Sequence, residues 1–470
     1  MRGIICYESM LGGIKMKKNI QIAYIGGGSR LWARSLMNDL ALETSFQGTI
    51  KLYDIDYEAA KRNEIIGNML MAKDEALGDF TFKAVKTLKE ALTDADFVLI
   101  SILPGTFKEM TDYVHLPEKY EIYQTVGDTV GPAGIFRSLI MMPMIETIAL
   151  AIKAYCPEAF VLNFTNPMTM TVQMLYEVFP EIKAFGNCHE VFFVQKILAR
   201  VLKEKTGIET NYRNITINPQ GINHFTWINY AVYKDIDLIP LYQDFVNQYY
   251  DEGLLINETY ENVYPFGSAE RVKLDLFKKY NVIAAAGDRH LVEFFPANWY
   301  LKDNETIKNW KFHRTPVELR INQMNRNDQH SKDIINGTAQ IHIYPSGEEG
   351  IAQIKALLGL GDLITNVNMP NLGQIENLPK YAIVETNARF TLGKVQPILS
   401  GPMDKNVVEL TTPHLIIHQH LIDSYHTKNL DSARLAFQID PLMSSLSAEQ
   451  KDQLFDEIKE KMGPYLSYYV

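Results

Sequence analysis

Two loops of the sequence carry side chains that could share a metal ion. Cys188 lies in the segment Asn-Cys-His-Glu at 187–190, and His224 ends the segment Gly-Ile-Asn-His at 221–224. A thiolate and an imidazole are good ligands for a divalent cation, and two protein ligands leave positions open for a bidentate substrate. Free cysteines and single histidines are also common as structural residues, so the spacing alone leaves both interpretations open.

Two carboxylates stand between small or turn-forming residues. Asp128 is in a Gly-Asp-Thr-Val-Gly-Pro loop at 127–132, and Asp288 is in a Gly-Asp-Arg-His segment at 287–290. Either could act as a general base, and either could equally be a solvated loop charge. Asn166 precedes a proline at the end of an expected strand, where it could bind a sugar hydroxyl or mark a structural turn.

A glycine-rich turn near the start of the chain predicts a dinucleotide site. Gly26 and Gly28, followed by Ser29, lie between an expected strand and helix, where a backbone without side chains can approach a pyrophosphate. Asp54 ends the next strand and could hold a ribose hydroxyl pair, which favours NAD over NADP. The strand that ends at Ser101 would return the chain beside the cofactor. The glycine spacing is incomplete, so a plain tight turn is the alternative.

Apolar runs that alternate with helical patterns predict the fold that positions these groups. We expect strands at Asn19–Ile25, Thr49–Tyr53, Phe97–Ile102, Phe160–Phe164 and Thr216–Asn223, and helices at Leu31–Leu40, Tyr57–Lys73, Ser346–Leu360 and Ala448–Met462. This alternation favours an α/β fold with a Rossmann-type doubly wound parallel sheet and a C-terminal α+β domain, as in lactate and malate dehydrogenases. We expect an extension at 1–18, an NAD-binding domain at 19–200 and a substrate and oligomerisation domain at 201–470.

The composition narrows the class of function. The chain of 470 residues has a net charge of −10, with 46% hydrophobic and 22% charged residues, so non-specific nucleic-acid binding is disfavoured. The most apolar segment, Ser138–Tyr155, contains Glu146 and Lys153 and is expected to be a buried helix. Three cysteines are too few for a disulfide framework, and no signal peptide is evident, so the cytoplasm is the expected compartment.

Several of these segments, in this order, resemble glycoside hydrolase family 4, the NAD-dependent glycosidases. They are the glycine loop, Asn166-Pro167, the Cys-His-Glu-Val segment at 188–191 and the Gly-Ile-Asn-His segment at 221–224. The similarity extends from about Ile20 through nearly the whole chain. It implies a glycosidase that uses NAD and a divalent metal, typically Mn²⁺, and that acts on a small-molecule glycoside. The family usually forms dimers or tetramers, so a homo-oligomer is expected.

The resemblance implies a chemistry and a role for each candidate residue. NAD takes a hydride from sugar carbon 3, a base removes the proton on carbon 2, the glycosidic oxygen leaves, and water adds before the hydride returns. Cys188 and His224 would bind the metal, and Asn166 the substrate. Asp128 would assist the base, for which Asp288 is our candidate. His189 would bind substrate or donate a proton.

Two features predict that the sugar is not phosphorylated. Ser-Ile-Leu-Pro-Gly at 101–105 lacks the arginine with which phosphosugar enzymes of the family bind phosphate, and His189 replaces the usual Asp or Asn after the metal cysteine. Several stretches, among them Asn-His-Phe-Thr-Trp at 223–227, are similar to the α-galacturonidase group. A uronate needs a cation, and the planar fork of arginine suits a carboxylate, so Arg289 is the first candidate and Arg137 the reserve.

Three other interpretations remain. An α-glucosidase of the same family would share the Cys-His-Glu-Val segment. An NAD-dependent 2-hydroxy acid dehydrogenase would share the cofactor half and the Asn-Pro turn, but it would need a His–Asp relay and no thiolate ligand. A non-catalytic NAD-sensing protein would keep Cys188 and His224 as core residues.

Overall fold

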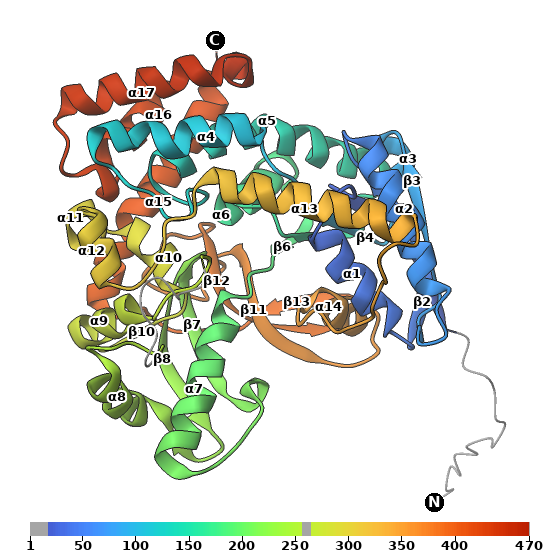
Figure 1. The fold of residues 1–470 in the computed structure, drawn as a ribbon, viewed down its shortest axis with the longest axis horizontal. Coiled ribbons are helices and arrows are strands. Elements are labelled where there is room, and N and C mark those ends of the chain that lie inside the picture. Colours follow the sequence, from blue (N-terminus) through green and yellow to red (C-terminus); the bar gives the residue numbers. More distant parts are fainter. Residues whose placement is uncertain (1–16, 256–264, 470) are drawn as a thin grey trace, which may run out of the picture.

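One continuous mixed sheet runs through the protein. The computed structural model describes residues 17–255 and 265–469, so the predicted extension lies almost entirely outside the described residues. Within these ranges the strands follow the order β10-β8-β7-β12-β11-β6-β5-β4-β1-β2-β3, with β13 beside β12 and β9 beside β8. Figure 1 shows the N-terminal strands on one side of the molecule and the lobe that holds β7, β8 and α7–α9 on the other.

The strands of the N-terminal half are β1 (Lys18–Ile25), β2 (Phe46–Tyr53), β3 (Phe80–Val85), β4 (Phe97–Ile100), β5 (Phe160–Asn163) and β6 (Lys183–Gly186). They pair in parallel in the order β3-β2-β1-β4-β5-β6. This is the order of a dinucleotide-binding doubly wound sheet, and it confirms the predicted fold class. The crevice beyond the carboxyl ends of β1 and β4 is the expected ligand site of such a sheet.

Both faces of this half-sheet are buried, which explains its apolar runs. Ile22 and Tyr24 of β1 belong to a core with α1, α2 and α14, whereas Ala23 and Ile25 face a second core that contains α5. The helices of this half are α1 (Trp32–Ala41), α2 (Tyr57–Met71), α3 (Leu88–Leu92), α4 (Phe107–His115), α5 (Gly131–Tyr155), α6 (Met168–Val178) and α7 (Glu190–Thr206). Helix α5 is long and apolar enough to cross a membrane, but 67% of its most apolar window is buried inside the protein, as predicted.

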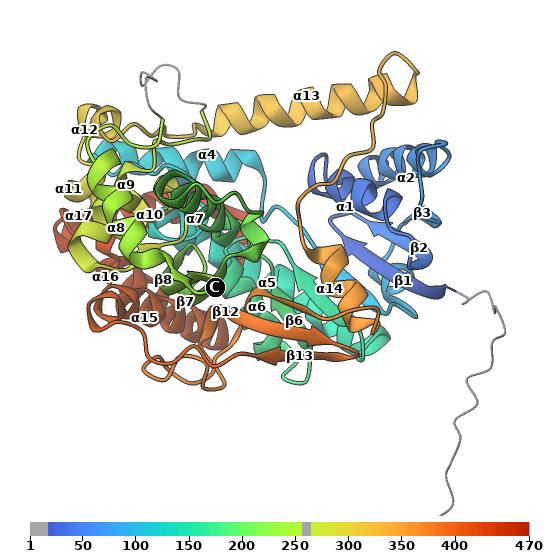
Figure 2. The ribbon, with the colours of Figure 1, turned by 90° about the horizontal axis from the view of Figure 1, so that it is seen from below.

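The C-terminal half adds antiparallel strands and most of the remaining helices. The strands are β7 (Thr216–Ile222), β8 (Phe225–Tyr233), β9 (Ile236–Asp237), β10 (Ile283–Ala284), β11 (Leu363–Pro370), β12 (Ile383–Thr391) and β13 (Lys394–Pro397). The helices are α8 (Leu238–Tyr249), α9 (Arg271–Tyr280), α10 (Asp288–Leu291), α11 (Ala297–Tyr300), α12 (Asn304–Asn309), α13 (Val317–Ile335), α14 (Gly350–Leu357), α15 (Lys405–Thr427), α16 (Asp431–Ile439) and α17 (Ala448–Met462). In Figure 2, α13 extends as one long helix from the region of α4 to that of α2.

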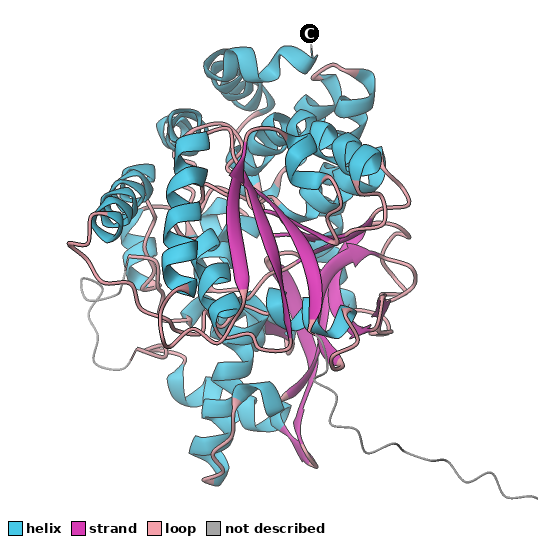
Figure 3. Cartoon of the chain, turned by 90° about the vertical axis from the view of Figure 1, so that its right-hand side faces the viewer, coloured by secondary structure: helices cyan, strands magenta, loops and turns pink. Residues whose placement is uncertain are grey.

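The halves of the sheet meet through few backbone pairs. The joint is the pairing of β11 with β6 at Asn368 and Gly186, and within the C-terminal half β12 pairs with β7 at Glu385 and Gly221. Figure 3 shows the strands as one twisted surface, with helices on both of its faces. The joint therefore places loops of the C-terminal half beside the carboxyl ends of the parallel strands.

One predicted helix is shorter than expected. The pattern at Ser346–Leu360 predicts a helix from its first residue, but α14 begins only at Gly350. Ser346 donates from its backbone N–H and its hydroxyl to Asp39 of α1, and Gly347 has a left-handed φ of 85°. This anchor holds the segment before α14 in a non-helical path over α1.

The turn after β1 is tightly packed against the neighbouring strands. Gly26 has φ of 89°, and a Cβ at this position would lie 2.0 Å from the carbonyl oxygen of Ser101. A Cβ on Gly28 would lie 2.8 Å from Asp54 Oδ2. Glycine is therefore required here by close backbone approach as well as by conformation.

We predict that Gly26→Ala destabilises the protein far more than Gly207→Ala. Gly207 has a similar φ of 76°, but a Cβ added there would have no atom within 4 Å, so this position reports the conformational cost alone. We expect a loss of about 1 kcal/mol at Gly207 and about 3 kcal/mol or more at Gly26. The unfolding midpoints of the two variants measure the difference, and equal decreases would contradict the packing argument.

Candidate functional site

The predicted cofactor residues gather at the first turn of the sheet. The backbone N–H of Gly28 donates to Asp54 Oδ2 at 2.8 Å, and that of Asp56 donates to Asp54 Oδ1 at 2.9 Å. Ser29 Oγ accepts the N–H of Trp32 at the start of α1 at 3.1 Å. Burial raises the pKa of Asp54. A carboxylate beside a glycine turn and a helix N-terminus suits a dinucleotide, with the Asp54 carboxylate available to ribose hydroxyls.

A cavity of about 320 Å³ lies next to this turn. Apart from Asp288 and the reserve candidate Arg137, it contains every residue predicted to bind metal or substrate or to act in catalysis, from both halves of the chain. Its lining consists of Trp32, Val126, Asp128, Phe164, Asn166, Met168, Asn187, Cys188, His189, Glu190, His224, Phe266, Arg289, His290 and Arg320. Cavities of this size that combine an apolar wall with a few polar groups are typical of small-molecule sites.

A chain of hydrogen bonds orients His224. The Thr129 hydroxyl lies 2.7 Å from Asp128 Oδ1 and 2.8 Å from His224 Nδ1. An ionised carboxylate can only accept, so the hydroxyl donates to Asp128 and accepts from Nδ1–H. This tautomer leaves the lone pair of His224 Nε2 available for a cation. His224 itself occupies the two-residue turn between β7 and β8, with a left-handed φ of 61°.

Asp128, His224 and His290 form a donor cluster whose potential ligand atoms all lie within 4.8 Å of one another. The two imidazole rings stack with centroids 3.8 Å apart. Burial lowers the pKa of His224 to about 3 and that of His290 to about 4, which leaves both neutral. Burial opposes ionisation of Asp128, but the adjacent rings of His290 and His224 and the charges of Arg137 and Arg320 lower its pKa below the ordinary value.

These donors fit a divalent cation. One carboxylate and two neutral imidazoles are suitable ligands, and the Nδ1 atom of His290 is buried without a partner among the described residues. Cys188 lines the same cavity as His224 but is not a member of this donor cluster. Burial raises the pKa of the Cys188 thiol, and the charges of Glu385 and Glu190 raise it further. A bound cation would favour the thiolate.

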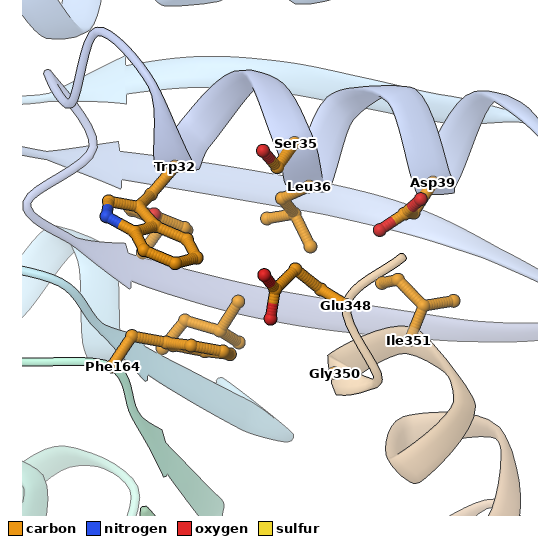
Figure 4. A pocket seen from close by; sticks show the side chains of 10 residues that line it. Trp32, Ser35, Leu36, Asp39, Phe164, Glu348, Gly350 and Ile351 are labelled. Carbon is orange, nitrogen blue, oxygen red and sulfur yellow. The ribbon is translucent and has the colours of Figure 1, made fainter. Parts of the chain in front are cut away.

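Asn166 and His189 lie in the cavity with the metal candidates. Asn166 Nδ2 donates to Asp128 Oδ2 at 3.4 Å, and its Oδ1 is buried without a partner among the described residues. His189 Nδ1 lies 3.3 Å from Glu348 Oε1. Burial lowers the pKa of His189, but the Glu348 hydrogen bond and the charges of Glu348 and Glu190 together outweigh it, so the net pKa is raised. A second, smaller pocket lies between α1 and the start of α14. Figure 4 shows Glu348 in this pocket, beside Trp32 and Phe164, and these two aromatic residues also line the main cavity.

The structure does not bring Asp288 to the cavity, so the prediction of Asp288 as the base is wrong for this geometry. Its side chain is 0% exposed, and its carboxylate accepts the N–H groups of Val272 and Lys273, at 3.2 and 3.0 Å, in the first turn of α9. Burial raises the pKa of this carboxyl, and the neighbouring Glu270 adds to the effect. Asp288 therefore stabilises a helix terminus.

Arg289 lines the cavity, but its guanidinium is already engaged. Nε donates to His313 O at 3.2 Å and Nη1 to Phe266 O at 2.9 Å, and Nη2 donates to Thr125 O at 3.4 Å and to Thr315 Oγ1. Arg137, the reserve candidate, donates from Nε to Asn166 O at 3.0 Å and does not line the cavity. Neither arginine offers a free fork to a carboxylate.

His290 and Arg320 are cavity residues that were not predicted from the sequence. In the sequence, His290 is part of the Gly-Asp-Arg-His segment, which predicted a role for Asp288 and none for His290. Arg320 lies on α13 in a polar stretch with no motif, so no local signal identifies it. Glu293 has a structural role that its sequence context does not indicate. Its Oε1 accepts the N–H groups of Thr125, Val126 and Gly127 at 2.5, 2.7 and 3.0 Å, and this holds the Asp128 loop.

Comparison with protein families identifies the chain. The model of the family 4 glycosyl hydrolases matches residues 21–204, and the model of the C-terminal domain of the same family matches residues 220–443. The chain belongs to family 4 of the glycosyl hydrolases. Alpha-galacturonidase of Thermoanaerobacterium saccharolyticum is 54% identical to this family 4 chain over 451 residues, which are 95% of the chain and 97% of that protein.

Solved structures agree with this assignment. The structure of the lplD protein from Bacillus subtilis is 48% identical, with a TM-score of 0.89 over 94% of this family 4 chain and 100% of that one. A 6-phospho-alpha-glucosidase from gut microorganisms, in complex with NAD and Mn²⁺, is 18% identical with a TM-score of 0.78 over 95% and 99% of the chains. The second likeness shows the shared fold.

We predict that His290→Asn weakens Mn²⁺ binding about 10- to 100-fold, as does His224→Asn, since each removes a nitrogen of the donor cluster. Isothermal titration with MnCl₂ measures the affinities. His342→Asn is the control because His342 is exposed and lies outside the cavity. If His290→Asn binds Mn²⁺ like the parent protein, the cation does not use His290. Cys188→Ser in the same assay reports separately whether the thiol is a ligand.

We predict that Asp288→Asn lowers stability and leaves catalysis nearly intact. An asparagine can accept only one of the two backbone N–H groups, so we expect a loss of about 2 kcal/mol in unfolding free energy. Asp303→Asn, at the N-cap of α12, is the matched control with little loss, because asparagine caps a helix about as well as aspartate. A fall in kcat of about 100-fold or more in folded Asp288→Asn would restore this residue as the base.

Proposed function

We propose that this chain hydrolyses α-galacturonides, that is, α-linked glycosides of non-phosphorylated galacturonic acid such as those of pectin. It would act with NAD and a divalent cation, for which Mn²⁺ is the first candidate. The observation that carries the proposal is the 54% identity, along nearly the full length of both chains, to a protein named alpha-galacturonidase. The 6-phospho-alpha-glucosidase with NAD and Mn²⁺, which shares the fold, supports the choice of cofactors.

The residues of the cavity have roles that fit this chemistry. When bound, NAD takes up and returns a hydride, and a cation polarises the sugar oxygens that it contacts. The glycine turn and Asp54 would orient the dinucleotide so that its reactive end faces the cavity beside Trp32. Asn166 Oδ1 is an unpaired acceptor for a sugar hydroxyl. Asp128 aligns the amide of Asn166 and, through Thr129, the ring of His224.

Proton transfer falls to the groups that line the cavity. His189 pairs with Glu348 through Nδ1 and can hold or release a proton at Nε2, which suits a proton donor or a substrate ligand. Asp128 stays ionised near neutral pH and can assist a base through its hydrogen bonds. Because Asp288 is engaged in hydrogen bonds to the first turn of α9, the candidates for the base are His189, Asp128 and His290.

The domain boundaries, the compartment and the assembly remain proposals. We keep a cofactor half at 19–200 and a substrate half at 201–470, joined by the continuous sheet. A reducing cytoplasm would suit the free thiols of Cys156 and Cys188. A homo-oligomer follows from the resemblance to the family.

The test is turnover of 4-nitrophenyl α-galacturonide with NAD and Mn²⁺, compared with the α-glucoside. We expect hydrolysis of the galacturonide, loss of activity after dialysis against a chelator, and recovery with Mn²⁺. Hydrolysis of the glucoside alone would move the chain to the α-glucosidases. Oxidation of a 2-hydroxy acid with NAD that survives the chelator would instead make it a dehydrogenase.

A further inference from the structure

Arg320 is a guanidinium of the cavity that forms no ion pair within 4 Å among the described residues, although the charge of Asp128 lies near enough to attract it. It lies in the first turns of α13 and lines the cavity with Asp128, Cys188 and His290. Its Nη2 donates to the carbonyl oxygen of Val126 at 3.0 Å. Within the described ranges this is its one hydrogen bond, and its Nε is buried without a partner. A partly buried guanidinium that forms no close ion pair is costly, and an anionic ligand would relieve part of that cost.

The two arginines of the cavity differ in what they have left to offer. The N–H groups of Arg289 point to backbone carbonyls and to Thr315, so this side chain connects segments of the chain. Arg320 uses a single one of its five N–H donors in the part of the chain that the structure describes. Of the two, Arg320 can therefore present adjacent N–H groups to a planar anion.

The helix that carries Arg320 is fixed at both ends. At its start, the N–H of Val317 donates to His115 Nε2 at 3.1 Å. Near its end, Asp328 forms ion pairs with Arg62 at 2.9 Å and Arg30 at 3.5 Å. The two anchors hold α13 against α4 and α2, as Figure 2 shows. Arg320 thus extends from a supported helix, which limits the entropy lost when it binds a ligand.

We infer that Arg320 forms the subsite for the carboxylate of the sugar and selects a uronate over a sugar with a neutral carbon 6. This inference rests on the proposed function, since it names the group by which an α-galacturonide would be recognised. The donor cluster of Asp128, His224 and His290 lines the same cavity and would hold the ring hydroxyls through its cation. Arg320 takes the role that the sequence suggested for Arg289.

The experiment compares two sugars that differ only at carbon 6. The protein with NAD and Mn²⁺ is assayed with 4-nitrophenyl α-galacturonide and 4-nitrophenyl α-galactoside. For Arg320→Gln we expect kcat/KM for the galacturonide to fall about 30- to 100-fold, mostly through KM, and kcat/KM for the galactoside to change less than about threefold. Arg326→Gln is the matched control, because Arg326 lies on the same helix but is exposed. It should leave both values unchanged.

A conservative variant and a binding assay guard against misfolding and against failure of the proposed function. Arg320→Lys keeps the charge but loses the fork, and we expect it to lose at least about fivefold of the preference for the galacturonide. Calorimetry of galacturonic acid against galactose, again with NAD and Mn²⁺ present, measures the subsite without turnover. The parent protein should bind the acid more tightly, and Arg320→Gln should not.

The outcomes separate the two proposals. If the parent protein hydrolyses the galacturonide and Arg320→Gln or Arg320→Lys keeps the full preference, the carboxylate subsite is overturned and the proposed function stands. If the parent protein does not hydrolyse the galacturonide, the proposed function fails, and calorimetry alone decides the subsite. A loss of NAD affinity in Arg320→Gln with an unchanged sugar preference would overturn the inference, because Arg320 would then serve the cofactor.

Discussion

The buried carboxylate of Glu293 is the interaction on which the geometry of the cavity depends. It accepts consecutive backbone N–H groups from Thr125 to Gly127, so the loop before Asp128 wraps around a single side chain. Burial raises the pKa of Glu293 to about 7 in spite of these hydrogen bonds. The same loop offers its carbonyl groups to Arg289 and Arg320. The segment from Thr125 to Gly127 thereby sets the positions of Asp128, Arg289 and Arg320.

The parallel half of the fold could be predicted from the sequence because its signals are local. An apolar strand, a glycine turn and a helix follow one another at the start of the chain, and the predicted elements match β1, α1 and β2 closely. The pattern at Ala448–Met462 predicts α17 to the residue. The Ser346 anchor to Asp39 could not be foreseen, because it joins positions more than 300 residues apart.

Local sequence signals were also insufficient to identify every functional residue of the site. Asp288, Arg289 and His290 are adjacent in sequence, but they lie in the single turn of α10, where successive side chains point about 100° apart. As a result Asp288 faces α9, Arg289 contacts carbonyl groups and His290 reaches the cavity. The Gly-Asp-Arg-His pattern identified the right segment of the chain. Which of its residues reaches the cavity could be decided only from the structure. Arg320 could be found only from the structure, because its importance comes from what it does not contact.

The narrow joint in the sheet has a thermodynamic consequence. Strands β6 and β11 share one residue pair, whereas the cavity takes Asp128, Asn166 and Cys188 from one half and His224, His290 and Arg320 from the other. A ligand that bridges these groups adds its binding energy to the attachment between the halves. By mass action, saturation at about 100 times the dissociation constant would contribute about 2.7 kcal/mol. Bound substrate and cofactor would therefore strengthen the attachment between the two halves, and the folded protein would be more stable when the site is occupied.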